Sequence, residues 1–228
     1  MIAALVTAAI SLSVAPAHVS MAPGSTQTLE VTNTGRTAIV VAASTAGYPL
    51  DLRGRARIVQ SAGTASWLSL RPGRLVLPPR STVPLTVAAH RPPGARPGDH
   101  DALVLLTSLP RAAGALAVRM RVGVVVAVRV PGRLVSELDA VALRRARPGL
   151  IELSLANRGN VVEQIVPGRV GLVLWRRGRV LVRLAPVVRK LLPLTRGLAE
   201  LHYPRRLRGL VTAVVEVGPR RWTFPLRL

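Results

Sequence analysis

The sequence predicts an all-β protein built from two tandem β-sandwich domains, and three observations support this fold class. Short runs rich in Val, Leu, Ala and Ile recur along the chain, as in strands with one buried face. Turn-forming residues, including 19 Gly and 19 Pro, separate these runs. The length of 228 residues exceeds one immunoglobulin-like sandwich of about 100 residues and suits two. Two immunoglobulin-like domains are therefore expected, over residues 11–130 and 131–228.

The composition restricts both the core and the chemistry. Hydrophobic residues make up 49% of the chain but aromatic residues only 3%, so aliphatic side chains must fill the cores, which favours strands. Cysteine is absent, which excludes disulfides, thiolate zinc sites and a cysteine nucleophile.

The beginning of the chain resembles part of an export signal. Residues 1–14 are apolar apart from three hydroxyl side chains, and the small residues 15–17 resemble a cleavage site. No Lys or Arg precedes the apolar run, so residues 1–10 are interpreted as the remnant of a signal whose start lies upstream, and an extracellular or cell-envelope location is expected. The run is shorter than the roughly 20 residues that span a bilayer. Alternatively, residues 10–19 form the first strand, with Pro16 as a kink of an edge strand; both interpretations can hold.

Turn signals delimit the expected strands of the first domain. Pro23-Gly24-Ser25 and the Asn-x-Gly turn at residues 33–35 end the first two of them. The third is apolar almost throughout and predicts a central strand covered on both faces. The expected strands are residues 11–21, 26–32, 36–43, 67–70, 75–77, 83–87, 102–108 and 116–130.

The last of these strands is the candidate binding segment. Apolar and arginine side chains alternate at its start, and residues 122–128 are continuously apolar. An exposed strand of this kind can pair with a strand of a partner; the alternative is that residues 116–130 are simply the buried last strand of the domain. The predicted partner-strand edge consists of Val118, Arg119, Met120, Arg121 and Val122.

The second domain repeats the pattern of the first. An Asn-x-Gly turn at residues 157–159 follows an early strand, as at residues 33–35, and this weak internal repeat favours two related domains. Residues 186–194 are bounded by prolines, which favours an apolar strand or crossover over an amphipathic helix. Further strands are expected at residues 170–175, 179–184, 199–203, 209–217 and 222–228.

Over residues 11–130 the order of four phrases resembles the first domain of bacterial WxL-interacting, peptidoglycan-associated surface proteins. The phrases are Val14-Ala15-Pro16-Ala17, Met21-Ala22-Pro23-Gly24-Ser25 with its Asn33-x-Gly35 turn, Trp67-Leu68, and Pro92-x-x-Ala95-x-Pro97-Gly98-Asp99-His100. The second half, with Asn157-Arg158-Gly159-Asn160, is similar to the second immunoglobulin-like domain of that architecture. The resemblance implies a noncatalytic surface protein. That family usually carries a C-terminal membrane anchor, and residues 222–228 form no apolar span. At the level of the fold, the two-domain plan is also similar to periplasmic pilus chaperones.

No arrangement of residues points to catalysis. His18, His90 and His202 lack an adjacent acid or serine phrase of a triad, and G-x-S-x-G, phosphate-loop and H-E-x-x-H patterns are absent. Asp99 and Asp101 share one face of an extended strand and His100 takes the other, which favours a solvated strand entrance over a metal site. The tryptophans are expected to fill cores or rims rather than to stack on sugars: Trp67, Trp175 and Trp222. Tyr48 and Tyr203, each beside a proline, are expected at corners or rims. No catalytic residue, metal, cofactor or small-molecule substrate is predicted; an enzyme remains a distant third hypothesis.

The formal net charge of +22 suggests that the protein binds anionic partners. All basic residues except Lys190 are arginines scattered along the chain, which favours compositional drift over a selected anion-binding surface. The leading hypothesis is a noncatalytic cell-envelope or secreted protein that contacts cell-wall polymer or a surface partner protein, with anionic polymer meeting the arginines. One alternative is an arginine-rich binder of anionic lipid or, less favoured, nucleic acid; the other is a periplasmic chaperone-like strand-donating protein.

Overall fold

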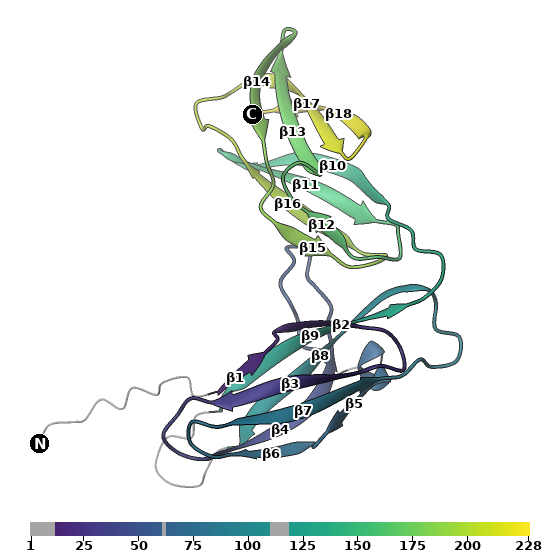
Figure 1. The fold of residues 1–228 in the computed structure, drawn as a ribbon. Coiled ribbons are helices and arrows are strands. Elements are labelled where there is room, and N and C mark those ends of the chain that lie inside the picture. Colours follow the sequence, from purple (N-terminus) through teal and green to yellow (C-terminus); the bar gives the residue numbers. More distant parts are fainter. Residues whose placement is uncertain (1–11, 61–62, 110–118) are drawn as a thin grey trace, which may run out of the picture. The chain divides into compact units, whose positions relative to one another are not determined.

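The computed structural model describes residues 12–60, 63–109 and 119–228 and confirms the all-β prediction (Figure 1). The predicted signal remnant at residues 1–10 lies outside the described residues. Contacts divide the chain into two compact units. The first holds the described residues among 1–48, 58–96 and 100–130, and the second holds residues 49–57, 97–99 and 131–228.

The first unit is a sandwich of two sheets, with strand orders β1-β3-β7-β5 and β2-β9-β8-β4-β6. Alternate residues of both sheets fill one core, in which Leu29, Leu85, Val124 and Val126 are fully buried, as expected for aliphatic period-two strands. Its elements are β1 (Leu12–Ala15), β2 (His18–Met21), β3 (Thr26–Asn33), β4 (Ile39–Gly47), η1 (Thr64–Trp67), β5 (Leu68–Arg71), β6 (Arg74–Leu77), β7 (Thr82–Ala89), β8 (Gly98–Leu109) and β9 (Arg121–Val130).

The expected first strand, residues 11–21, is divided between the two sheets. β1 pairs antiparallel with β3, whereas β2 pairs parallel with β9. Pro16 and Ala17 separate the two strands. Because Pro16 has no N–H to donate to a ladder, the pairing of one sheet ends there and the chain joins the other sheet.

The second unit contains sheets of order β10-β11-β16 and β14-β13-β17-β18 and the pair β12-β15. Residues 186–194 were expected to form an apolar strand or a crossover rather than a helix, and Arg189–Leu191 within them form the short strand β15. The strands are β10 (Leu138–Arg147), β11 (Leu150–Asn157), β12 (Glu163–Ile165), β13 (Val170–Arg176), β14 (Arg179–Leu184), β15 (Arg189–Leu191), β16 (Arg196–His202), β17 (Leu210–Val217) and β18 (Arg220–Arg227).

A buried asparagine at the end of a strand occupies the same structural role in each unit. Asn33 donates from Nδ2 to the carbonyl oxygens of residues 37, 77 and 78, and its Oδ1 accepts the Gly35 N–H at 2.9 Å. Asn157 donates to the carbonyl oxygens of residues 161, 191 and 192, and its Oδ1 accepts the Gly159 N–H at 2.9 Å. The two identical hydrogen-bond sets support the internal repeat.

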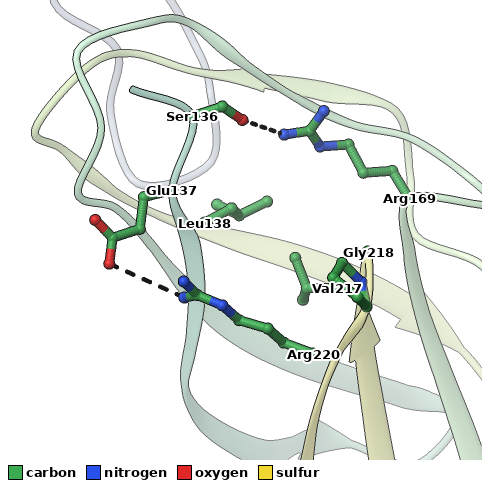
Figure 2. Close-up of a pocket in the computed structure, with 8 residues that line it drawn as sticks. Ser136, Glu137, Leu138, Arg169, Val217, Gly218 and Arg220 are labelled. Atoms are coloured by element: carbon green, nitrogen blue, oxygen red, sulfur yellow. Dashed lines mark hydrogen bonds and ion pairs between the residues drawn. The ribbon is translucent and has the colours of Figure 1, made fainter. Parts of the chain in front are cut away.

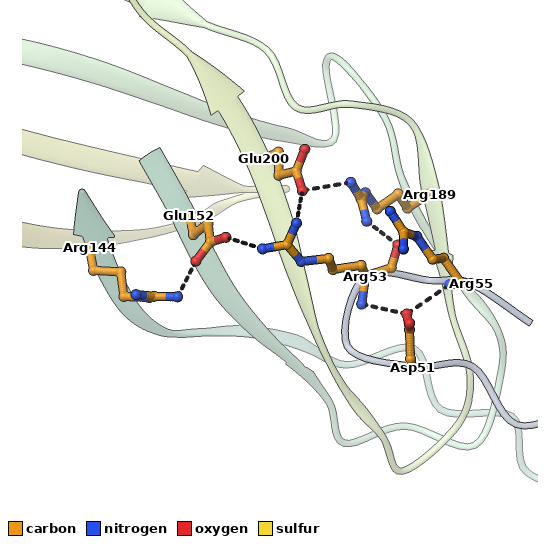
Figure 3. A network of polar contacts seen from close by, with 7 residues as sticks. All are labelled: Asp51, Arg53, Arg55, Arg144, Glu152, Arg189 and Glu200. Atoms are coloured by element: carbon orange, nitrogen blue, oxygen red, sulfur yellow. Dashed lines mark hydrogen bonds and ion pairs between the residues drawn. The ribbon is translucent and has the colours of Figure 1, made fainter. Parts of the chain in front are cut away.

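Residues 49–57 are held in the second unit by arginine–carboxylate pairs (Figure 3). Arg53 reaches Glu152 at 3.1 Å and Glu200 at 3.5 Å, while Arg144 pairs with the other oxygen of Glu152. Arg189 pairs with Glu200 at 3.3 Å and donates to the Arg53 carbonyl oxygen. The Glu152 side chain is only 1% exposed, so its charge depends on these partners.

Asp51 shapes the turn that presents Arg53. Its Oδ1 accepts the backbone N–H groups of Arg53 at 2.8 Å and Arg55 at 2.9 Å. These hydrogen bonds, that from Arg55 foremost, lower the pKa of the Asp51 carboxyl, because they favour its charged form. The Arg55 side chain itself takes no part in the ion pairs drawn in Figure 3, which makes it a matched control for Arg53.

Arg53→Ala is expected to lower the free energy of unfolding by about 1–2 kcal/mol. In the described part of the chain, Glu152 then keeps only Arg144 as a cationic partner, and Glu200 keeps only Arg189. Half of the Arg53 side chain is exposed, which limits the loss. Arg55→Ala is expected to cost under about 0.5 kcal/mol. Urea unfolding measures both. Hydrogen exchange at the Leu198 amide, which donates to Leu52 O at 2.6 Å, should accelerate only in Arg53→Ala. Equal losses in the two variants would refute the role of the ion pairs.

Candidate partner-binding strand edge

The first half of β9 lies at an incompletely covered edge of its sheet. β2 is the neighbour of β9 on the side opposite β8, and their register runs from His18↔Val125 to Met21↔Val128. The Val125 N–H also donates to Ala17 O at 3.1 Å. Since β1 has joined the other sheet, the neighbour of β9 in the described chain reaches no further than Val125.

The backbone direction of β9 identifies the polar groups at this edge. Ser108 N donates to Met120 O at 2.9 Å, and Met120 N donates to Ser108 Oγ at 2.8 Å, so Met120 faces β8. Successive residues of a strand direct their backbone groups to opposite sides. Arg121 and Gly123 therefore face the other side, as Val125 does. In the part of the chain that the structure describes, no strand is paired with Arg121 or Gly123 there.

The side chains of this segment alternate as the sequence analysis expected. Val124 is fully buried in the core, and Met120 and Val122 pack against the same core while partly exposed. Arg121 is exposed and donates from Nε to Thr107 Oγ1 at 3.3 Å. Of the five predicted edge residues, Arg121 and Val122 begin β9, Arg119 and Met120 precede it, and Val118 lies outside the described residues; their role in binding stays a prediction.

A small apolar cluster lies on the other face of the same sheet. Leu103 and Leu105 are 5% exposed and pack with Ala46, Tyr48 and Val125. Burial, and then the charge of Asp101, raise the pKa of the Tyr48 hydroxyl, since both disfavour its anion. Apolar side chains thus lie on both faces of this sheet near β9, beside the backbone groups of its edge.

The residues around Asp99 serve structural roles. The Asp99 carboxylate is buried and accepts the Val162 N–H at 2.8 Å. The His100 ring lies 4.5 Å from the Trp67 ring, and its Nε2 lies 2.8 Å from Arg96 O. Among the described residues, no group of three His, Cys, Asp or Glu side chains could hold a metal ion.

The aromatic side chains lie mostly at the cores. Trp67 and Trp222 pack, partly buried, against the cores of the first and second unit, and Tyr203 is 5% exposed. Trp175 is half-buried on β13. The expected core or rim positions agree with this placement for Trp67, Trp222 and Tyr203, whereas Trp175 is not among the residues packed against the core.

A pocket of ≈ 340 Å³ in the second unit is lined by polar residues that include Ser136, Glu137, Arg169 and Arg220 (Figure 2). Its cations are already neutralised: Arg169 pairs with Glu163 and donates to Ser136 Oγ at 3.0 Å, and Arg220 lies 3.9 Å from Glu137 and 2.6 Å from Asp139. The sequence analysis did not predict these pairs or the Arg53 network. The partners of Arg53–Glu152 and Arg220–Asp139 are 99 and 81 residues apart, and the nearer pair Arg169–Glu163 forms no recognisable motif.

No family model matches the chain, and no curated protein matches it. Solved structures do share its fold. A chain of the chaperone–tip adhesin complex of CFA/I fimbriae biogenesis has a TM-score of 0.58 at 10% identity and covers 94% of this chain and 98% of that chain. The YadV chaperone has a TM-score of 0.55 at 11% identity, with 96% and 100% covered. A chain of the Salmonella enterica complex of the SafA pilin with the SafB chaperone has a TM-score of 0.54 at 13% identity, with 96% of each chain covered.

At these identities the likeness establishes the fold alone. It extends along nearly the whole chain and confirms the fold-level similarity to pilus chaperones that the sequence suggested. The resemblance to WxL-interacting proteins and an association with peptidoglycan receive no support from the comparisons. Within the described ranges, no helix has the length and hydrophobicity needed to cross a membrane.

Proposed function

We propose that this chain is a noncatalytic, chaperone-like protein of the cell envelope that holds a partner polypeptide by pairing with its exposed strand at the β9 edge. The observation that carries the proposal is the position of Arg121 and Gly123, whose outward backbone groups have no paired strand in the described chain. The similar structures support the class of function: one was solved with a pilin and another with a tip adhesin, and a further one, of TM-score 0.50, is named a periplasmic chaperone.

Strand addition would combine two kinds of recognition. Backbone hydrogen bonds to Arg121 and Gly123 give affinity for any extended segment, whereas pockets for alternate side chains give specificity. Met120 and Val122 lie at the rim of the core, so a partner strand beside β9 would place its own apolar side chains against them. A surface-protein subunit with an unpaired strand offers this chemistry; a cell-wall polymer has no comparable backbone ladder.

The backbone component is tested by the pair Arg121→Pro and Arg121→Ala. Proline removes the outward N–H of residue 121 and is tolerated at strand edges, whereas alanine keeps the N–H and removes the same charge. Capture of a purified surface-protein subunit that has an unpaired strand is expected to fall at least about tenfold for Arg121→Pro and less than about twofold for Arg121→Ala. Capture by Arg121→Pro equal to that by Arg121→Ala, with both folded by circular dichroism, would rule out strand pairing here.

The location of the contact is tested by crosslinking. Because the chain contains no cysteine, Arg121→Cys and Val76→Cys each carry one attachment point for a photoreactive maleimide. Val76 is 63% exposed on β6, the opposite edge strand of the same sheet. Crosslinks to the subunit are expected from residue 121 and not from residue 76; the reverse pattern would place the partner elsewhere.

A further inference from the structure

Six exposed arginines lie on three parts of the second unit: the β13–β14 hairpin, the loop between β16 and β17, and the end of β18; Figure 1 shows these elements. Arg176 joins the first two of these parts: its guanidinium donates to Arg208 O and to Leu210 O, the latter at 3.3 Å. Leu210 lies opposite Arg227 in the β17–β18 register. We call this surface the arginine face; it consists of Arg177, Arg179, Arg183, Arg206, Arg208 and Arg227.

The charge of the arginine face is not neutralised within the unit. Across the described ranges, none of its six guanidinium groups pairs with a side-chain carboxylate, in contrast to Arg53, Arg144 and Arg169. Glu216 of β17 pairs with Arg221 at 3.2 Å, at the end of that strand opposite Leu210. The arginine face therefore presents a concentrated positive potential to an external anion.

Apolar side chains accompany these arginines. Leu174 and Ala213 point into the core, so their neighbours on the strands, Trp175 and Thr212, point outward. Val180 lies opposite Trp175 and is 41% exposed, and Leu210 is 72% exposed. The outer face of this sheet thus combines aliphatic side chains and a half-buried indole with Arg183 and Arg227, which lie opposite Val173 and Leu210.

We propose that the arginine face binds the surface of a bilayer that contains anionic phospholipid headgroups. The guanidinium groups meet the phosphates, and Leu210 and Val180 enter the boundary between headgroups and acyl chains. Nucleic acid would use the arginines but gives no role to an exposed leucine, and its bases stack on exposed aromatic rings. This surface is separate from the β9 edge, so the proposal goes beyond chaperone activity and can fail independently of it.

The test compares two triple variants with the same loss of charge. The first is Arg177→Gln with Arg179→Gln and Arg183→Gln; the control is Arg36→Gln with Arg74→Gln and Arg80→Gln, all exposed in the first unit. In co-sedimentation with phosphatidylcholine vesicles, binding should require added phosphatidylglycerol and weaken with salt. The first variant should bind about 100-fold more weakly than the unmodified chain and the control less than about threefold. Equal losses, or binding that does not need phosphatidylglycerol, would overturn the proposal.

A second measurement separates lipid from nucleic acid. Leu210→Cys and Val76→Cys are labelled with a polarity-sensitive fluorophore, since no other cysteine is present. Vesicles should shift the emission of the label at residue 210 to the blue and leave that at residue 76 unchanged, whereas duplex DNA should shift neither. A label at residue 210 that stays in water on vesicles, or DNA binding as tight as vesicle binding, would refute the membrane assignment.

Discussion

Asn157→Leu is expected to lower the free energy of unfolding of the second unit by about 4 kcal/mol. Leucine has a similar volume, so the loss comes from hydrogen bonds rather than from a cavity. The amide satisfies three carbonyl oxygens and one N–H, two of them at 2.8 and 2.9 Å, in a site where Asn157 is only 2% exposed. Water cannot replace these partners without opening the strand end, and an unsatisfied buried polar group costs about 1–3 kcal/mol.

The same substitution at Asn33 should destabilise the first unit by a similar amount, because its hydrogen-bond set is the same. Gln164→Leu removes an exposed amide from the second unit and is the control, with an expected change within about 0.5 kcal/mol. Urea unfolding, with amide exchange to assign each transition, measures the three variants. A loss at Asn157 no larger than that at Gln164 would show that the buried amide is not a stabilising element.

The Asn-x-Gly turns show which hydrogen bonds can be predicted from the sequence. Their spacing predicted a repeated turn, and the Oδ1 bonds to Gly35 and Gly159 are local enough to follow from it. The hydrogen bonds from Nδ2 could not be predicted from the sequence, because Asn157 donates to the carbonyl oxygens of Leu191 and Leu192, which lie more than thirty residues away. The tertiary packing of the strands, not the local sequence, determines those partners.

The strands predicted from the sequence were wrong where the pairing between strands, rather than the local alternation of apolar residues, determines the structure. β10 was not predicted, because Arg144, Arg145 and Arg147 obscure its alternation; it is an edge strand, and exposed charge is what such strands carry. The division of residues 11–21 into β1 and β2 was also missed, although Pro16 was expected to kink the strand. That division is what leaves the start of β9 uncovered, so the edge geometry could not follow from the alternation at residues 118–122.

The spatial distribution of the arginines could not be predicted from the sequence either. In the sequence the arginines look scattered, which favoured compositional drift. In the structure some of them neutralise buried carboxylates, as Arg53 does for Glu152, and those of the arginine face have no side-chain carboxylate partner among the described residues. The arginines behind the net charge of +22 therefore have different structural roles, which the composition alone does not distinguish.

The second large effect is expected for Arg169→Met, which should lower the free energy of unfolding of the second unit by about 3 kcal/mol. The Glu163 side chain is 2% exposed, and its partners are Arg169 and the Ser136 hydroxyl, which donates at 2.6 Å. Methionine keeps much of the aliphatic stem of arginine but removes the charge. The carboxylate then remains buried with one neutral donor, and an uncompensated buried charge is costly; the partial exposure of Arg169, 39%, places the loss at the lower end of the range.

Arg179→Met is the matched control, because Arg179 is exposed on the same unit and has no carboxylate partner among the described residues; it should change stability by less than about 0.5 kcal/mol. The double variant Glu163→Leu with Arg169→Met distinguishes charge from packing. If the loss arises from the unpaired carboxylate, removing that carboxylate as well should restore most of the stability, since apolar replacements of a buried pair are often neutral. A double variant less stable than Arg169→Met would instead assign the loss to packing around Ser136 and contradict the electrostatic explanation.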